Sequence, residues 1–386
     1  MLNTYYNPVR TYQGVGSLSV LPQLVNGLNP KKILLLIWDK SVLENRYIKE
    51  TAAAFADILT IKTFAWSNPE MFQLYEIYNE TKNENYELVI AVGGGSVLDV
   101  GKSLCCLYAK PVDSLETMRN MIAAKTYSKP HCKWIGVPTT AGTGSEADAG
   151  CVITNPDTNE KVGLKTPDLF PVLCIEDPEL MKSVPAHYTA YQGFDALSHS
   201  LEGYISKFAN LMSDMYAITA IENVGRYLAR AVKDGNDIEA RTHVAFGNIL
   251  SGTVMCVGTT SSQHSLEHAL SAYHPNLPHG AGLIMLSRAY FGNVIAHHAC
   301  DERFIRMAKA MGMENADKPE DFLTVLQKLL EYCGVADLKM SDYGITPDEF
   351  PKMAENAMGP MGGLFACDRV ALTKEDVIGI YQKSYK

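Results

Sequence analysis

Short apolar runs and stretches of helical spacing alternate along the first half of the chain. The apolar runs have the length of buried strands and lie at 32–38, 58–64, 88–92 and 134–138. Between them, the spacing of apolar positions predicts helices that end near residue 55 and that cover 71–81. Strands that alternate with helices are typical of a parallel sheet with covering helices. The first half is therefore predicted to be an α/β domain.

The second half has a different pattern, in which strand signals nearly vanish. Long stretches of helical spacing lie at 190–206, 212–232, 241–257, 301–311 and 320–333. The change falls between the Asp177-Pro178 and Val184-Pro185 dipeptides, which interrupt the chain. The pattern predicts an α/β domain at 1–182 and an all-α domain at 183–386.

Composition excludes several classes of partner. The 386 residues carry a net charge of −9, which repels a phosphate backbone, so no nucleic acid partner is expected. No apolar run is long enough to cross a bilayer, and the first ten residues lack the layout of a signal peptide, so no membrane partner is expected. Nine cysteines without framework spacing fit reduced thiols. We therefore expect a cytoplasmic protein that acts on a small molecule.

Carboxylate and imidazole side chains recur at helical spacing in the second half. Asp195 and His199 are four residues apart, and His264 and His268 repeat that interval, so each pair shares one helix face. His279 follows, in a chain with only 10 histidines. One pair alone is more typical of a surface hydrogen bond, but a carboxylate with three neutral imidazoles suits divalent iron or zinc. Spacing leaves open which imidazoles bind the metal.

A glycine-rich turn follows one of the buried runs. The strand at 88–92 leads into Gly93-Gly94-Gly95-Ser96, where backbone N–H groups and a helix N-terminus can approach a phosphate. The P-loop pattern fails because Ser96 occupies the position of its first glycine, and the Rossmann fingerprint fails because Leu98 occupies that of its third. A structural turn is the alternative to a nucleotide-binding turn of another pattern.

A second loop rich in glycine and hydroxyl groups follows the next predicted strand. Residues 139–146 read Thr-Thr-Ala-Gly-Thr-Gly-Ser-Glu. Such a loop on its own is structural more often than not. Two such loops at the ends of adjacent parallel strands would form a dinucleotide crevice. The first domain is therefore expected to bind a dinucleotide.

Specific strings extend along nearly the whole chain. The most specific are the string at 138–146 and the combination of Asp195-x-x-x-His199 with His264-x-x-x-His268. The others are Asn7-Pro8, Gly14-x-Gly16, Asp39-Lys40, Asn68-Pro69, Gly93 to Lys102, Asp177 to Leu180, Gly193 to Glu202 and Pro278-His279-Gly280. With these strings, the chain resembles the iron-containing (group III) alcohol dehydrogenases.

The resemblance implies an active site in the cleft between a dinucleotide-binding α/β domain and an all-α C-terminal domain. By resemblance, His268 is a non-ligand histidine near the substrate and the nicotinamide. The implied metal ligands are Asp195, His199, His264 and His279. The implied cofactor residues are Asp39 at the adenosine ribose, Asn68, Gly94, Gly95 and Ser96 at the pyrophosphate, and Thr139, Thr140, Thr143 and Lys161. Asp99 also matches the family and is interpreted as a support of the turn.

The resemblance also implies the reaction, a hydride transfer between a nicotinamide cofactor and a short primary alcohol or diol, or its aldehyde. A homodimer or higher homo-oligomer is expected. Fe²⁺ is the expected metal, with Zn²⁺ as the alternative, because the same ligands bind both. The metal would serve as a Lewis acid at the alcohol oxygen, and His268 would relay the released proton. Asp39 favours NAD over NADP because its carboxylate repels a 2′-phosphate.

The chain departs from the family pattern at several positions. Glu70 stands where the family usually has threonine, and the segment between His268 and His279 is one residue longer than in some relatives. That segment helps to shape the substrate pocket, so a reductase of a functionalised aldehyde is an alternative. Further alternatives are another enzyme of the dehydroquinate synthase-like and glycerol dehydrogenase group, or a non-enzymatic nucleotide sensor. The complete set of ligands argues against the sensor.

Overall fold

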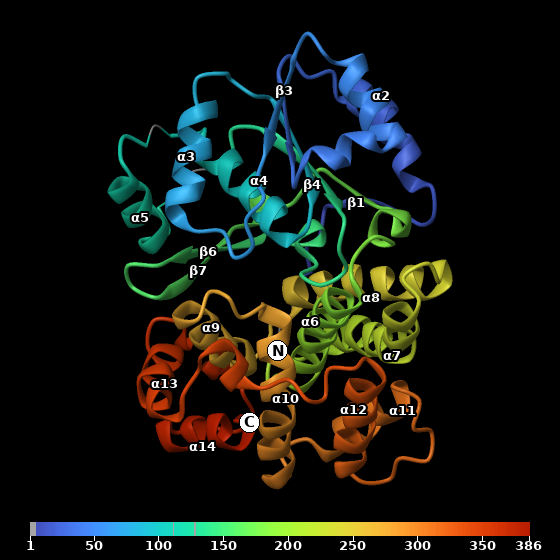
Figure 1. Cartoon of the computed structure of the whole chain (residues 1–386), viewed down its shortest axis with the longest axis vertical. Helices are drawn as coiled ribbons and strands as arrows, with labels where there is room; N and C mark the ends of the chain where they lie inside the picture. The colour runs from blue at the N-terminus through green and yellow to red at the C-terminus, as the bar shows by residue number, and fades with distance from the viewer. Residues whose placement is uncertain (1–4, 111, 127–128) are drawn as a thin grey trace.

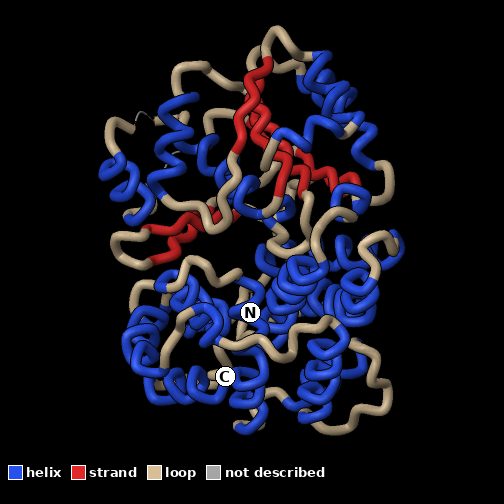
Figure 2. Tube along the Cα trace, viewed as in Figure 1, coloured by secondary structure: helices blue, strands red, loops and turns tan. Residues whose placement is uncertain are grey.

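A six-stranded parallel sheet organises the first half of the chain (Figure 2). The computed structural model describes residues 5–110, 112–126 and 129–386. The four strands predicted from apolar runs are confirmed, whereas the edge strand β1 and its neighbour β8 were not predicted. In sheet order, the strands are β1 (Arg10–Gln13), β8 (Leu173–Glu176), β5 (Lys133–Pro138), β4 (Leu88–Gly93), β2 (Ile33–Ile37) and β3 (Leu59–Thr63).

Helices cover both faces of this sheet because its central strands are apolar on both sides. In β2, Ile33, Leu35 and Ile37 face the core beneath α1 and α2, while Leu34 and Leu36 face the core beneath α3, α4 and α5. The helix predicted over 71–81 is confirmed as α3. The helices of this half are α1 (Leu21–Leu28), α2 (Arg46–Ala54), α3 (Met71–Thr81), α4 (Gly95–Leu107) and α5 (Leu115–Ala123).

An antiparallel hairpin of β6 (Gly150–Asn155) and β7 (Glu160–Lys165) extends from the α/β half toward the helices below it (Figure 1). The sequence pattern did not predict this hairpin. Strand β7 packs against helix α9 (Ser262–Tyr273), so the hairpin joins the two halves. Short 3-10 helices lie at Ser17–Val20, Lys40–Glu44, Ser145–Ala147, Pro167–Leu169, Pro178–Met181, Met340–Tyr343, Pro347–Glu349 and Gly362–Cys367.

Helices alone follow β8 among the described residues (Figure 2). The five predicted helices are confirmed as α6, α7, α8, α11 and α12. The predicted boundary at 182/183 lies in the connection between β8 and α6 and stays a prediction. No helix among the described residues combines the length and apolarity needed to span a membrane. The helices are α6 (Ala186–Ile205), α7 (Leu211–Lys233), α8 (Ile238–Val257), α9, α10 (His279–Ala296), α11 (Asp301–Ala310), α12 (Glu320–Tyr332), α13 (Phe350–Met358) and α14 (Lys374–Ser384).

Helix α8 holds the loop after β5 against the helical half. The N–H of Gly144 donates to Oδ1 of Asn248 on α8 at 2.8 Å. Gly144 has a φ of 62°, and a Cβ there would lie 2.6 Å from the Cα of Gly252, so this contact requires glycine. The side-chain amide of Asn248 also donates to Glu146 at 2.7 Å. Since α8 packs on α6, the loop is fixed relative to the helix that carries Asp195.

Candidate functional site

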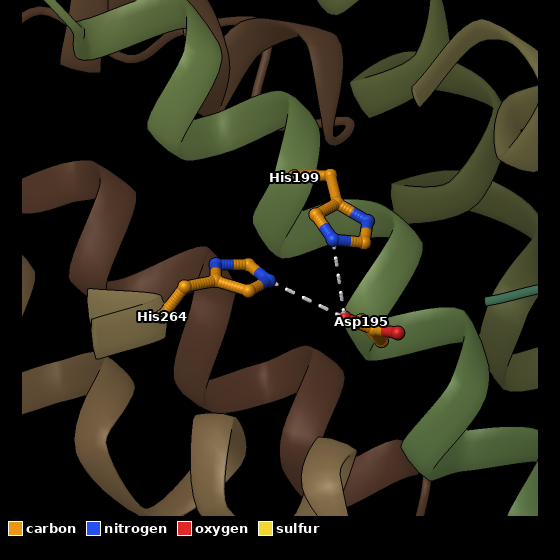
Figure 3. Close-up of side chains that lie close together, drawn as sticks. All are labelled: Asp195, His199 and His264. Atoms are coloured by element: carbon orange, nitrogen blue, oxygen red, sulfur yellow. Dashed lines mark ion pairs between the residues drawn. The ribbon is translucent and has the colours of Figure 1, made fainter. Parts of the chain in front are cut away.

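Three imidazole rings converge on one carboxylate oxygen. The Nε2 atoms of His199, His264 and His279 lie 3.6, 3.5 and 3.4 Å from Oδ1 of Asp195. Figure 3 shows His199 and His264 directed toward Asp195 from two helices. Asp195, His199 and His264 are buried, and the His279 side chain is 23% exposed. The four residues expected to bind a metal are therefore brought together.

Three helices position these side chains. Asp195 and His199 lie one turn apart on α6, which is buried at every position from 193 to 205. His264 lies in the first turn of α9, and His279 is the first residue of α10. A helix buried on all sides is expected to be apolar, and charged residues are rarely buried without a partner. The buried polar residues of α6 therefore indicate a site.

The three distances from Asp195 Oδ1 fit a small divalent cation, and the ligand atoms of Asp195, His199 and His264 all lie within 4.8 Å of one another. Ligand atoms at about 2.1 Å from a tetrahedral metal lie about 3.4 Å from one another. The observed distances to Asp195 Oδ1 are 3.4–3.6 Å. This oxygen and Nε2 of His264 are buried, and neither has a hydrogen-bond partner among the described residues. A divalent metal requires ligand atoms that converge in this way and are not already engaged in hydrogen bonds.

The protonation states of Asp195 and His199 suit metal binding. Burial raises the pKa of Asp195, but the charges of His199 and His279 outweigh it and hold the pKa well below its ordinary value. Burial lowers the pKa of His199 to about 3. An anionic carboxylate and a neutral imidazole are the forms that bind metals.

Two further carboxylates hold the outer nitrogens of two rings. Nδ1 of His264 donates to Oε1 of Glu202 at 2.5 Å, and Nδ1 of His279 donates to Oε2 of Glu267. Burial opposes protonation of His264, but Glu202 outweighs it and raises the pKa to about 10. Burial likewise opposes the effect of Glu267, which raises the pKa of His279. Such carboxylate–imidazole pairs orient metal-binding histidines and fix their tautomers.

His268 lies beside these rings without sharing their carboxylate. Its ring centroid is 5.2 Å from that of His279 and 6.2 Å from that of His264, with the latter ring nearly perpendicular. No ion pair joins it to Asp195 among the described residues. Burial, with the charge of Lys161, holds the pKa of His268 well below its ordinary value. His268 therefore differs from His199, His264 and His279 in its distance from Asp195, although its ligand atom lies within 4.8 Å of those of Glu267 and His279.

Most of the predicted cofactor residues follow strands at the carboxyl edge of the sheet. The chain passes from β2 outward to β3 and returns to β4 on the other side of β2, so the strand order reverses between β2 and β4. Ligands of open α/β sheets bind at such a switch point. Asp39 follows β2, Gly94–Ser96 follow β4, and Thr139 follows β5.

The two glycine loops pack closely against each other. The N–H of Thr139 donates to the carbonyl oxygen of Gly93 at 3.0 Å. A Cβ on Gly95 would lie 2.4 Å from Thr143 Cγ2, and one on Gly94 would lie 3.3 Å from Thr140 Oγ1. No side chain among the described residues caps the N-terminus of α4, which leaves that end available to an anion.

Asp39, Asn68 and Lys161 also have partners within the chain. Asp39 is partly exposed and accepts a hydrogen bond from the N–H of Ser41 at 2.6 Å, so it caps a 3-10 helix. Oδ1 of Asn68 accepts from Nζ of Lys161 at 3.1 Å. Burial on β7 lowers the pKa of Lys161. The hairpin thus brings Lys161 to the strand edge, and Asp39 has a structural role as a cap.

Sequence reasoning missed Glu202 and Glu267. Glu202 lies two turns after Asp195, a spacing that could have shown it. Glu267 contacts His279 across a loop, and no spacing rule indicates that contact. Asp99 accepts from Ser145 Oγ at 2.6 Å and from the N–H of Val152 at 2.9 Å, in agreement with its interpretation as a support.

The comparisons with known proteins agree on one family. Residues 8–178 match the family described as iron-containing alcohol dehydrogenase, and residues 189–385 match the C-terminal domain of the same family. The 1,3-propanediol dehydrogenase of Citrobacter freundii is 30% identical, with 99% of this chain and 98% of that protein covered. The NAD-dependent methanol dehydrogenase of Bacillus methanolicus is 27% identical, with 92% and 93% covered.

Solved structures show the same relationship. An archaeal halo-thermophilic alcohol dehydrogenase from a Red Sea brine pool superimposes with a TM-score of 0.90 at 27% identity, covering 100% of this chain and 99% of that one. A 1,3-propanediol oxidoreductase has a TM-score of 0.88 at 26% identity, with both chains fully covered. The chain therefore belongs to the iron-containing alcohol dehydrogenase family and is an oxidoreductase of alcohols and aldehydes.

Proposed function

We propose that this protein transfers a hydride between NAD and a short primary alcohol or diol, or its aldehyde, at a divalent metal held by Asp195, His199, His264 and His279. The observation that carries the proposal is the convergence of three Nε2 atoms at 3.4–3.6 Å from one carboxylate oxygen. Loss of NADH absorbance with a panel of aldehydes, and its gain from NAD with the matching alcohols, tests the reaction. No turnover of any short alcohol or aldehyde by metal-loaded protein would contradict it.

The residues of the centre each have a part in this reaction. A bound divalent metal supplies Lewis acidity, which polarises an aldehyde carbonyl and favours deprotonation of an alcohol. Asp195 would contribute negative charge, and each imidazole would bind the metal in its neutral form. Glu202 and Glu267 keep two of the rings turned inward through their Nδ1 atoms. We propose Fe²⁺ as the resident metal, with Zn²⁺ as the alternative that the same donors accept.

The substrate class rests on the relatives. Relatives that act on propanediol and methanol, by their names, support a short primary alcohol or diol here. The alternative substrate is a functionalised aldehyde. To distinguish the two, kcat/KM is measured for each short aldehyde and for its carboxylated or sulfonated counterpart. Preference for a charged counterpart would favour the alternative.

The cofactor is proposed to lie across the switch point between β2 and β4. Gly94, Gly95 and Ser96 would bring backbone N–H groups and the α4 N-terminus to the pyrophosphate. Asn68, Thr139, Thr140, Thr143 and Lys161 are proposed to complete the crevice, with Asp39 at the adenosine ribose. The partly exposed Asp39 carboxylate would also repel a 2′-phosphate, which supports NAD over NADP.

Asp39→Ser is expected to reduce the preference for NADH over NADPH by about tenfold or more, because a like-charge repulsion of about 1.4 kcal/mol corresponds to that factor. Serine still offers an oxygen to the Ser41 N–H, so the cap survives. Comparison of kcat/KM for both cofactors measures the change. Asp39→Glu retains the charge and should retain the preference. An unchanged ratio in the serine variant would place cofactor selectivity elsewhere.

His268→Ala is expected to retain its metal and to lose about tenfold in kcat, with a changed pH profile, because a proton relay is removed while water can partly replace it. We expect the metal to stay because His268 lies beside the His264 and His279 rings but makes no contact with Asp195. Metal content by elemental analysis, measured with the pH dependence of kcat, checks both points. Metal loss as complete as in a His264 variant would make His268 a ligand.

We infer three further properties. A division into domains at 1–182 and 183–386 is supported by the change from sheet to helices between β8 and α6. Nine unpaired cysteines, seven of them buried, support a reducing, cytoplasmic environment.

Exposed apolar side chains at Phe208, Leu211 and Met215 near the start of α7 support a homodimer or higher homo-oligomer. Light scattering of the purified protein tests the oligomeric state.

A further inference from the structure

Glu267 is a fully buried acid next to the candidate metal centre. It lies on α9 between His264 and His268, and one carboxylate oxygen accepts the Nδ1 hydrogen of His279 on the neighbouring helix α10. Its other oxygen, Oε1, has no hydrogen-bond partner among the described residues. Burial of a carboxylate is costly unless nearby groups compensate it. A buried acid whose carboxylate accepts from His279 therefore indicates a role at that ring.

The opposite helix has a glycine where this carboxylate lies. Gly282 is three residues after His279 on α10, and a Cβ there would lie 2.7 Å from Cγ and 2.8 Å from Oε1 of Glu267. Glycine within a helix costs about 1 kcal/mol relative to alanine. The glycine is explained by the space that the Glu267 side chain occupies. Gly282 and Glu267 thus form a matched pair.

The contact with Glu267 determines which ring nitrogen of His279 carries the hydrogen. A carboxylate that accepts from Nδ1 leaves the lone pair of His279 on Nε2. That atom lies 3.4 Å from Oδ1 of Asp195, within the group of candidate ligand atoms. The contact therefore selects the tautomer that a metal needs.

We propose that Glu267 is a positioning residue that holds His279 for metal binding, and that Gly282 is required to accommodate it. The inference rests on the proposed metal centre. Glu202 has the corresponding contact with His264, at Nδ1. His199 has no such carboxylate among the described residues, so two of the three imidazoles are oriented in this way. We expect the contact between Glu267 and His279 to make the centre bind a divalent cation more tightly than it would without that contact.

The test measures the affinity of metal-stripped protein for Zn²⁺ by competition with a chromophoric chelator. Glu267→Met removes the acceptor at similar length and is expected to weaken binding about 10- to 100-fold, the usual effect of losing such a partner. Glu267→Gln keeps an acceptor oxygen without the charge and should fall between Glu267→Met and wild type. Gly282→Ala should weaken binding to a similar extent as Glu267→Met, because the added methyl displaces the carboxylate.

A matched control lies on the same helix. A Cβ on Gly292 meets only Leu323 Cδ1, at 3.8 Å, so Gly292→Ala should bind Zn²⁺ as wild type does. Circular dichroism and Tm of the metal-free variants separate lost folding from lost affinity. The visible spectrum of Co²⁺-loaded protein should change in Glu267→Met and not in Gly292→Ala, which a purely structural role of Glu267 would not produce. If Gly282→Ala fails to fold, the inference is tested by the two Glu267 variants without it.

Two results would overturn the inference. Wild-type affinity and an unchanged Co²⁺ spectrum in Glu267→Met would show that Glu267 does not position His279. Two Zn²⁺ ions per wild-type chain, falling to one in Glu267→Met, would instead make Glu267 a ligand of a second ion, since ligand atoms of Glu267, His268 and His279 lie within 4.8 Å of one another. Failure of wild-type protein to bind any Zn²⁺ would contradict the proposed metal centre itself, which separates the two failures.

Discussion

The His264→Ala variant is expected to lose its metal and at least about 1,000-fold in kcat/KM, because Lewis-acid catalysis is worth several kcal/mol and each 1.4 kcal/mol is tenfold. His264 contributes an Nε2 atom that is buried without a hydrogen-bond partner among the described residues and lies 3.5 Å from Asp195 Oδ1. Its removal also leaves the buried carboxylate of Glu202 without its imidazole partner. Elemental analysis and kcat/KM, measured on the same preparation, check the result.

The control for this variant is His297→Ala. His297 is exposed at the end of α10, where its Nδ1 contacts the carbonyl of Asn293, so its loss should change neither metal content nor activity. Circular dichroism should show that His264→Ala keeps its helices, since the surrounding core is mainly aliphatic. Substantial activity in a metal-free His264→Ala protein would contradict the assignment.

The Gly95→Val variant is expected to lose at least about 100-fold in kcat/KM for NADH, because hydrogen bonds to a charged group contribute about 1.5–3 kcal/mol each and more than one would be lost. Even a Cβ at this position would lie 2.4 Å from Thr143 Cγ2. Valine would therefore separate the two loops that are proposed to hold the pyrophosphate. The dissociation constant of NADH, from fluorescence titration, measures the effect.

The matched control is Gly27→Val on α1, where an added Cβ meets no atom within 4 Å. Both substitutions place a β-branched residue in a helix, so the control accounts for the propensity cost. Metal content should stay at the wild-type level in both variants, because the proposed metal centre lies on α6, α9 and α10. Unchanged NADH binding in Gly95→Val would contradict the proposed role of the glycine turn in cofactor binding.

Two central strands of the sheet could be predicted because they are buried on both faces. Strands β2 and β4 are uninterrupted apolar runs, as a central position in a parallel sheet requires. The edge strand β1 is short and mostly exposed, so its residues carry no such signal. Helix α10 escaped prediction for the opposite reason. It is buried from Gly280 to Ser287, and a helix that is apolar all round has no amphipathic period.

The candidate site was predictable as far as its residues lie one helical turn apart. The intervals from Asp195 to His199 and from His264 to His268 are visible in the chain. Spacing could not separate His268 from His279, because the choice depends on how α10 begins against α6 and α9. Glu267 depends on a contact between helices and on the space left by Gly282. Such contacts belong to tertiary packing and have no periodic signal.

The proposed metal centre is tested most directly by titrating metal-stripped protein with Fe²⁺ or Zn²⁺ while NADH-dependent aldehyde reduction is followed. Activity should be absent at the start, rise linearly and reach its limit at one ion per chain. Asp195→Ala protein, which lacks the carboxylate at the centre of the three imidazoles, should recover no activity in the same titration. Full activity before any metal is added, or full recovery in Asp195→Ala, would contradict a metal centre at these four residues.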